Sequence, residues 1–423
     1  MQAANNVVAP KRPSGAVKPV AARRGGYALD GVNFFVAAMQ AGFGVFVTVH
    51  LVQQGWAVQA IGFALTLSTM ASLVSQIPAG ALIDRMRDKR RAVQVGVAGV
   101  GAAALLLALR TDVPAVYVAQ ALQGLASSLI APGIAAISLA AVGHVAFGER
   151  TGRNARFASI GGGLTAGAMG LTGAYFEAVS IFWLTAVLTL PTLLLASLAG
   201  HGRAWADAAN PDCCGGGAEP GTPGWAGLKD LLLERRLLVF ALCIALFFLA
   251  SAAMPHGVVA RATLHRPYLA TLIAAGTMLL PQAIVAAISP WIGRTAERSG
   301  RRPLLLFGWG LVPLQGILFA TLPGFYALVI GQALNGFSSA VVGVMMPVVV
   351  ADLTRRAGGF NVTLGALGMA MSIGASLSTL LAGLTAAAFG GMVAFLGLAF
   401  TGLIGVVLLW IGLPETRPVP GTP

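Results

Sequence analysis

The chain has 423 residues, of which 57% are hydrophobic and 10% charged, and its mean hydropathy is +0.82. A soluble domain carries about 25% charged residues, so this composition excludes a protein whose main solvent is water. Apolar runs of about 20 residues, the length that crosses roughly 30 Å of hydrocarbon, recur along the chain. The sequence therefore predicts an all-α polytopic membrane protein, and its 55 glycines suit close packing of helices in lipid.

The apolar runs predict twelve transmembrane helices. Several runs exceed 20 residues, which permits tilted helices. The expected starts, in chain order, lie near Ala28, Val58, Ala92, Val113, Arg156, Ala178, Leu237, Ala270, Pro303, Phe325, Asn361 and Met392.

Positive charge is distributed unevenly between the two sides of this predicted membrane protein. The net charge is +13, and if the N-terminus lies inside, only Arg110, Arg261 and Arg266 of the 27 Lys and Arg residues lie outside. An excess of this kind on one side follows the positive-inside rule. We therefore expect both termini to be cytoplasmic, and we interpret the charge as a topology signal with no nucleic-acid partner.

A string of residues in the predicted fourth span returns in the tenth. The string "AQALQGLASS" occupies residues 119–128, and "GQALNGFSSA" occupies residues 331–340, 212 positions later. The loop "GALIDRMRDKRR" at 80–91 recurs as "GRTAERSGRRP" at 293–303, with an offset of 213. A long-range repeat of this kind indicates two copies of one ancestral unit. We expect two pseudo-symmetric six-helix bundles.

The boundaries of these units follow from composition. Residues 201–236 are rich in Gly and Pro at their centre, which is typical of a flexible linker, and end in an amphipathic stretch suited to the inner leaflet. The predicted parts are a basic cytoplasmic tail at 1–26, an N-terminal bundle at 27–200, the cytoplasmic linker at 201–236, a C-terminal bundle at 237–413 and a cytoplasmic tail at 414–423.

These residues resemble the major facilitator superfamily of secondary transporters. The most specific element is the family's loop pattern G-x-L-A-D-R-x-G-R-R, which occurs here twice at matched positions, although Arg87 replaces the usual Gly in the first copy. The resemblance covers nearly all of the chain and implies two halves that rock about a central site. The gating residues that it implies are Gly80, Asp84, Arg85, Gly293, Glu297 and Arg298.

The acids of the two loops have specific implied partners. In the family, the first acid contacts the start of helix 11 and holds the outward-facing state closed inside. For Asp84 we expect Arg85 and the pair at 355–356 as further partners, and for Glu297 the start of helix 5 near Arg153 and Arg156. The alternative is that both loops are solvated and only enforce topology.

The repeated string places polar side chains on one face of each of two spans. Polar groups within a membrane are costly unless they face the protein interior or a water-filled cavity. In the family, helices 1, 4, 7 and 10 line the central cavity, so the two faces should meet across it; hydrogen bonds that join neighbouring helices are the alternative. The candidate cavity residues are Gln40, Gln120, Gln123, Ser127, Gln332, Asn335 and Ser339.

Other polar residues have simpler interpretations. Asp30 stands at the start of the first span, where we expect it to cap the helix, with a coupling role as the alternative. His50 lies near the outer end of the same span, where we expect it at the membrane interface. Met254 and His256 are a weak metal-binding signal beside a proline, so we expect no metal site and no cofactor.

No Lys, Arg, Asp or Glu is predicted at mid-membrane. Gln120 stands where proton-coupled drug antiporters carry an arginine, and the fifth span lacks the Gly-Pro step of the antiporter signature. A rival interpretation, an intramembrane serine protease around Ser338, lacks the later histidine that would activate the serine, because the last histidine is His265. We therefore expect no enzyme activity.

The resulting functional prediction is a secondary transporter. An uncharged cavity wall favours a small neutral or amphipathic organic molecule, because a buried charge needs a partner. Efflux is favoured, and import of a small organic solute is the alternative. The expected partners are the substrate, the lipid bilayer and, as an open alternative, an ion gradient, for a monomer in a bacterial cytoplasmic (inner) membrane.

Overall fold

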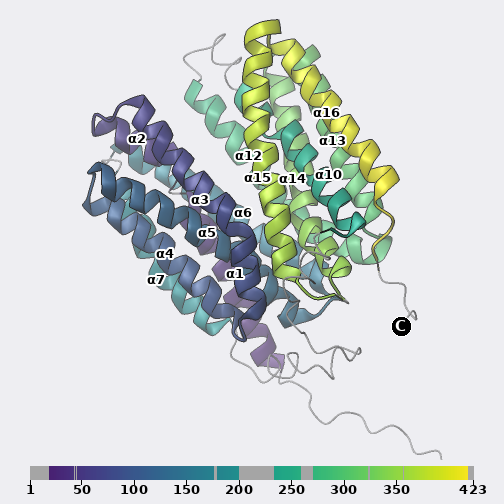
Figure 1. Ribbon diagram of the computed structural model, residues 1–423, viewed down its shortest axis with the longest axis horizontal. Coiled ribbons are helices and arrows are strands. Elements are labelled where there is room, and N and C mark those ends of the chain that lie inside the picture. The colour runs from purple at the N-terminus through teal and green to yellow at the C-terminus, as the bar shows by residue number, and fades with distance from the viewer. Residues whose placement is uncertain are drawn as a thin grey trace, which may run out of the picture.

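The computed structural model describes residues 19–41, 43, 45–175, 179–199, 233–258, 270–322, 324–355 and 357–417. The regular secondary structure in these ranges is entirely helical (Figure 1). Most of the predicted linker and of both predicted tails lies outside the described residues.

The helices follow one another with short connections. Within the described residues, eleven segments are long and apolar enough to cross a membrane, with α1 and α2 together forming the first. The less hydropathic α6 completes the predicted twelve. The helices are α1 (Pro19–Ala41), α2 (Val45–Gln53), α3 (Val58–Arg85), α4 (Lys89–Leu109), α5 (Val113–Val142), α6 (Phe147–Tyr175), α7 (Val179–Leu198), α10 (Arg235–Ser251), α12 (Ala270–Ser299), α13 (Arg302–Thr321), α14 (Phe325–Leu353), α15 (Phe360–Phe389) and α16 (Gly391–Gly412).

The predicted starts agree with the structure where apolar residues begin the helix. Helices α3, α5, α12 and α14 begin at the predicted residue. In contrast, α6 begins at Phe147, nine residues before the predicted Arg156. The extra turns carry Arg150 and Arg153, whose charges hydropathy counts against a span although both are paired in the fold.

The first span is broken in its middle. Helix α1 ends at Ala41, α2 begins at Val45, and Phe43 lies between them with its N–H donating to the carbonyl of Gln40 at 3.2 Å. The local sequence "AGFGV" contains two glycines, and glycine is a poor helix former. Non-helical backbone at this depth is tolerated where it borders protein or a cavity. The sequence analysis did not predict this break.

The helices form two groups that lie side by side (Figure 1). In the N-terminal group, α4 and α3 pack on α5, and α6 and α7 pack on α1; in the C-terminal group, α13 and α10 pack on α16, and α14 packs on α12. Small residues allow close approach: a Cβ added at Gly124 of α5 would lie 2.2 Å from the carbonyl oxygen of Ser68 in α3. The predicted class, two pseudo-symmetric six-helix bundles, is confirmed.

Two seams join the bundles, where α3 meets α15 and where α6 meets α12. In the first seam, a Cβ at Gly365 would lie 2.2 Å from the carbonyl oxygen of Gln76. In the second, a Cβ at Gly152 would lie 2.3 Å from that of Ser289. Both members of one contact are 213 residues from those of the other, so the sequence repeat has become a structural two-fold.

The seams lie toward one end of the molecule. They involve the C-terminal parts of α3 and α12 and the N-terminal parts of α15 and α6, and Figure 1 shows the bundles close together at the end where α1 begins. Apolar side chains close the same end, since Phe147 packs with Val348 and Ala351 of α14 and with Phe360 of α15. The structure is therefore closed at the end that carries the two repeated loops.

Candidate gate and transport cavity

The carboxylate of Asp84 binds the start of α15. Its Oδ1 accepts hydrogen bonds from the backbone N–H of Asn361 at 3.1 Å and from that residue's Nδ2 at 2.7 Å, and its Oδ2 accepts from the N–H of Val362 at 3.0 Å. Free N–H groups at a helix start carry partial positive charge, which favours a carboxylate there. The predicted contact of this acid with helix 11 is thus present, and its gating role stays a prediction.

The second loop makes the corresponding contact across the other seam. The Oε1 atom of Glu297 accepts a hydrogen bond from the backbone N–H of Glu149 in the first turn of α6, at 2.9 Å. The residue 213 positions after Glu149 is Val362, so the two carboxylates bind equivalent N–H groups. One bond is made here against three at Asp84, so the two contacts are unequal.

The expected basic partners of these acids are different in the structure. Arg85 is exposed and makes no ion pair within the described residues, whereas Lys89 Nζ donates to the backbone carbonyl of Asp84 at 3.0 Å. Arg153 binds Asp30, and Arg156 donates to a backbone carbonyl of α12. The acids therefore bind helix ends directly. Residue 356 lies outside the described residues.

Glycine is required at both predicted loop positions by close approach of the bundles. A Cβ at Gly80 would lie 2.2 Å from the carbonyl oxygen of Asn361, and one at Gly293 would lie 2.2 Å from that of Gly148. The turns that follow differ. Gly300 has φ +98°, whereas no described non-glycine residue has a positive φ, so the first copy accommodates Arg87 by a different backbone path. The side chain of Arg298 is exposed.

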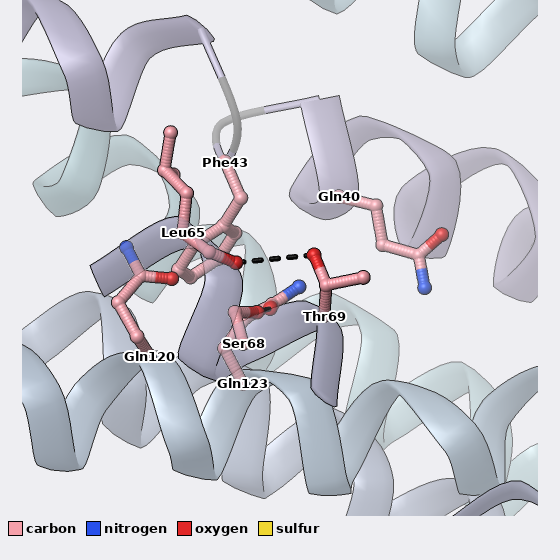
Figure 2. A pocket seen from close by; sticks show the side chains of 7 residues that line it. All are labelled: Gln40, Phe43, Leu65, Ser68, Thr69, Gln120 and Gln123. Atoms are coloured by element: carbon pink, nitrogen blue, oxygen red, sulfur yellow. Dashed lines mark hydrogen bonds between the residues drawn. The ribbon is translucent and has the colours of Figure 1, made fainter. Parts of the chain in front are cut away.

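A cavity of about 450 Å³ lies within the N-terminal bundle beside the break in the first span (Figure 2). Three of the seven candidate cavity residues line it: Gln40 from α1, and Gln120 and Gln123 from α5. The remaining lining is uncharged. It consists of Phe43, Leu65, Ser68 and Thr69.

Hydrogen bonds divide these amides into two kinds. The Oε1 atom of Gln123 accepts from Ser68 Oγ of α3 at 2.6 Å, and its Nε2 donates to Ser127 Oγ at 3.1 Å. Gln120 is 2% exposed, and its Nε2 has no hydrogen-bond partner. A buried donor without a partner costs about 1–3 kcal/mol. Gln123 thus joins two helices, as in the alternative interpretation, whereas Nε2 of Gln120 is buried beside the cavity without a partner.

The equivalent face of α14 does not line this cavity. Gln332 is 1% exposed and accepts a hydrogen bond from Asn335 Nδ2 at 3.4 Å, and Ser339 Oγ donates to Asn335 Oδ1 at 3.5 Å. These bonds stay within α14, and Nε2 of Gln332, like that of Gln120 at the equivalent position, is buried without a hydrogen-bond partner. That the two repeated faces meet across one central cavity stays a prediction.

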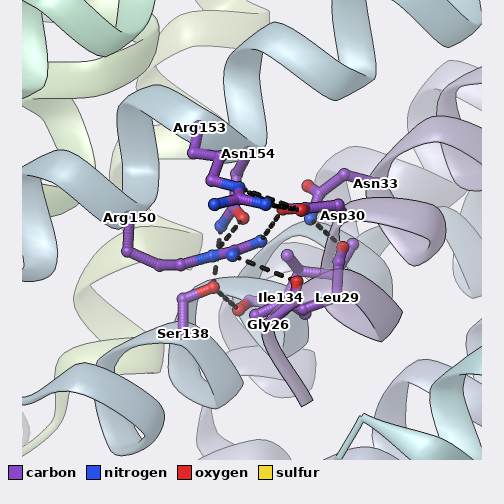
Figure 3. A network of polar contacts seen from close by, with 9 residues as sticks. All are labelled: Gly26, Leu29, Asp30, Asn33, Ile134, Ser138, Arg150, Arg153 and Asn154. Atoms are coloured by element: carbon purple, nitrogen blue, oxygen red, sulfur yellow. Dashed lines mark hydrogen bonds and ion pairs between the residues drawn. The ribbon is translucent and has the colours of Figure 1, made fainter. Parts of the chain in front are cut away.

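Asp30 is not a helix cap, and that prediction is wrong. It lies eleven residues after the start of α1, with 3% of its surface exposed, and pairs with two bases of α6 (Figure 3). Arg150 Nη2 donates to its Oδ1 at 2.7 Å, and Arg153 Nε donates to its Oδ2 at 2.9 Å. Asp30 and Arg150 are therefore buried together inside the N-terminal bundle, whereas the side chain of Arg153 is 43% exposed.

Amides and a hydroxyl complete this charged network. Arg150 Nε donates to Asn154 Oδ1 at 2.8 Å, and Asn154 Nδ2 donates to Ser138 Oγ of α5 at 2.7 Å (Figure 3). The network thus ties α1, α5 and α6 together with each described polar group paired. The sequence signal for this network is the three-residue spacing of Arg150, Arg153 and Arg156. This spacing is typical of one face of a helix, whereas the sequence analysis assigned the first two to a loop.

The corresponding place in the C-terminal bundle carries no such network among the described residues, although a buried ion pair joins Arg301 and Asp352 elsewhere in that half. Gly161 contacts the carbonyl of Phe34, and Gly374 makes the corresponding contact with the carbonyl of Ala245. This pair of contacts shows which residues of the two bundles are equivalent. In this alignment, Asp30 corresponds to Ala241. Arg150 and Arg153 correspond, with the 213-residue offset, to Thr363 and Ala366. The fold itself therefore does not require charges at these places.

Burial and contacts describe the surroundings of two further candidate residues. His50 is 2% exposed and packs against the ring of Phe182, and its expected place at the membrane interface stays a prediction. Met254 is buried, and His256 Nδ1 lies 3.2 Å from the carbonyl oxygen of Ala252. Within the described residues no group of three metal-ligating side chains comes together.

Comparisons with known proteins decide the family. The family model of the Major Facilitator Superfamily matches residues 29–289 and 263–423. The chain belongs to the major facilitator superfamily. Two MFS-type transporters of uncharacterised function, from two strains of Mycobacterium tuberculosis, are each 34% identical to it over 405 residues, or 95% of each chain.

Solved structures share the fold. The human organic anion transporter MFSD10 has a TM-score of 0.66 and 17% identity, with 94% of this chain and all of that one covered. The fucose:proton symporter FucP of E. coli, solved as a variant, has a TM-score of 0.70 and 14% identity, with 92% and 98% covered. At such identities these structures establish architecture alone.

Proposed function

We propose that this member of the superfamily exports a small, uncharged or amphipathic organic molecule by alternating access. The observation that carries the proposal is the cavity in the N-terminal bundle, whose lining contains three amides, two hydroxyls, an aromatic ring and an aliphatic side chain but no charge. A volume of about 450 Å³ is in the range of small-molecule sites, which are typically about 300–1,000 Å³. An ionic ligand would find no counter-charge in this lining.

The amides also support a second candidate, import of a small polar solute. Gln120 offers an unpartnered buried donor, and Gln40 is exposed at the cavity wall. Amides and hydroxyls together match a solute with several hydroxyl groups, whereas Phe43 and Leu65 match an apolar face. The lining is compatible with both export of an amphipathic molecule and import of a polar solute, and a direct measurement of flux separates the two.

Alternating access is supported by the gate. Helix ends hold the two acids at one end of the molecule, where backbone contacts are too close for any side chain at four glycines, while the cavity lies away from that end. The distribution of Lys and Arg supports this closed end as the cytoplasmic one, with both termini cytoplasmic. The mycobacterial relatives support a bacterial inner membrane. Because one chain contains both bundles, a monomer suffices for transport.

The proposal is tested by flux in proteoliposomes of the purified protein. A panel of neutral, amphipathic, sugar-like and anionic compounds would be measured in both directions, with and without an imposed pH gradient. We expect movement of neutral or amphipathic compounds and a loss of that movement in the variant Gln120→Ala. Transport of strongly anionic compounds alone would contradict the proposed substrate class, and accumulation inside right-side-out vesicles would replace export by import.

A further inference from the structure

One arginine of α6 stands outside the charged network of the N-terminal bundle. Arg156 is exposed, and its Nε donates to the carbonyl oxygen of Ala286 in α12 at 3.0 Å. That carbonyl is free because Pro290, four residues later in the same helix, has no N–H to donate to it. Arg156 therefore completes the hydrogen bonding of a helix in the other bundle, across a seam.

This bond uses one of the five N–H groups of the guanidinium. No other partner of Arg156 is found among the described residues. A charge on a membrane protein is costly unless it reaches the interface or an anion. The remaining donors of Arg156 therefore favour an anionic group from outside the chain.

Helix geometry shows which side of α6 carries this charge. Successive residues are rotated by about 100° around a helix, so positions 153, 156 and 164 share one side. The opposite side carries Asn154, which binds α5, and Ala155, which packs against the core of the C-terminal bundle. Since that opposite side faces protein, Arg153 and Arg156 face outward, and Leu164, 63% exposed, continues the same side as lipid-facing surface.

An aromatic side chain lies at the same place. The ring of Tyr27, which is 65% exposed, lies 5.4 Å from Cζ of Arg153, whose side chain is 43% exposed. Tyrosine is enriched where headgroups meet hydrocarbon, and arginine side chains extend to that level. Tyr27, Arg153 and Arg156 thus mark the headgroup level of the leaflet at the closed end of the molecule.

We propose that Tyr27, Arg153 and Arg156 form a binding site for the phosphate of an anionic phospholipid, at the outer edge of the seam between α6 and α12. Arg156 links the lipid to the C-terminal bundle there, because its Nε binds the carbonyl of Ala286 and its other donors bind the phosphate. Guanidinium groups suit this ligand because their planar donors match the oxygens of a phosphate. Asp30 carries one negative charge and pairs with both Arg150 and Arg153, so it neutralises only one of these two positive charges. The cluster formed with Arg156 therefore keeps a net positive charge.

The test measures lipid preference of the full chain, independently of transport. Purified protein would be reconstituted in phosphatidylcholine, and the motionally restricted fraction of spin-labelled phosphatidylglycerol would be compared with that of spin-labelled phosphatidylcholine. We expect the wild type to prefer phosphatidylglycerol, Arg156→Gln to lower that preference about fivefold, and Arg156→Lys to retain most of it. The melting temperature of each variant shows that it is folded.

The matched control is Arg110→Gln, which removes an exposed arginine beyond the far end of α4 that is paired with Asp112. This variant should keep the preference of the wild type. Equal lowering by Arg110→Gln and Arg156→Gln would mean that net charge alone attracts the lipid, which would overturn the site. Unchanged preference in a folded Arg156→Gln protein, or displacement of the lipid by inorganic phosphate, would overturn it as well.

Discussion

Asp84 and Glu297 occupy equivalent positions but hold their seams unequally. The carboxylate of Asp84 accepts three hydrogen bonds at the start of α15, and that of Glu297 accepts one at the start of α6. Bonds to a charged group contribute about 1.5–3 kcal/mol each. The seam between α3 and α15 is therefore the more strongly held of the two at the level of side chains.

We predict that Asp84→Asn shifts the protein toward the state open at this end, and that Glu297→Gln does so less. The neutral amide loses its attraction to the helix end and can no longer accept at both oxygens. The measurement is the labelling rate of single cysteines placed in the cavity, with reagent added from the cytoplasmic side. A rise of about tenfold for Asp84→Asn is expected, since loss of one such bond is worth at least 1.4 kcal/mol.

Asp88 provides a matched control in the same loop. Its carboxylate accepts from the N–H of Arg90 and caps α4, with no contact to the other bundle. Asp88→Asn should leave labelling unchanged. If Asp84→Asn behaved like Asp88→Asn at equal expression, the acid would act only on topology, as in the alternative interpretation of the loop.

The cavity amides lead to a second prediction at this scale. Gln120→Ala should lower transport about tenfold or more and leave the melting temperature unchanged, because its Nε2 has no partner to lose. Gln123→Ala should lower the melting temperature, because it breaks bonds to Ser68 and Ser127. Melting and flux would be measured on the same purified variants, with Asn335→Ala as the corresponding change in the other bundle. Normal specific flux for Gln120→Ala would place the binding site elsewhere.

Helices show where sequence patterns predict structure and where they do not. Hydropathy marks the start of α3, α5 and α14 because apolar residues begin there. It places α6 too late and Asp30 at a helix end, because charges that neutralise one another in the fold are counted separately in the sequence. The family resemblance, extended to the second acid by the repeat, correctly predicts that both acids contact helix starts. It does not predict their basic partners, since those depend on side-chain packing across helices.

The charged network of α1 and α6 gives a prediction at the scale of elements. Asp30→Asn leaves Arg150, whose side chain is 7% exposed, buried without its counter-charge. Breaking a buried ion pair from one side costs about 3–5 kcal/mol. We therefore expect a large fall in the melting temperature of the purified protein in detergent.

A second change separates charge from packing. Arg150→Gln in the background of Asp30→Asn removes the uncompensated charge and should recover part of the lost stability, although each change alone is destabilising. The corresponding positions of the other bundle already carry no charges, so a neutral arrangement is compatible with the fold. Additive losses in the double variant would show that the three charges do not act as a unit.

At the scale of the whole molecule, the two-fold relation makes both seams depend on glycine. Gly365 meets the carbonyl of Gln76, and Gly152 meets that of Ser289 at the related place. The backbones of opposite bundles touch there, so no rearrangement of side chains could make room for a Cβ. Closure of this end thus depends on glycine at four positions, Gly80, Gly152, Gly293 and Gly365, where the bundles meet.

The last prediction follows from this closeness. Gly365→Val and Gly152→Val should each prevent closure of this end, since the added atoms would lie within about 2.3 Å of a backbone oxygen. Each bundle should still fold, because the clash lies between the bundles, so expression and helix content should match the wild type while transport is lost.

Gly310→Val is the control, because nothing lies within 4 Å of a Cβ at that glycine of α13. Distances between spin labels at the ends of α6 and α12 would report the open seam. Loss of transport with an unchanged distance would show that these glycines act on a step other than closure, and retained transport in either seam variant would mean that the bundles do not need to meet this closely during the cycle.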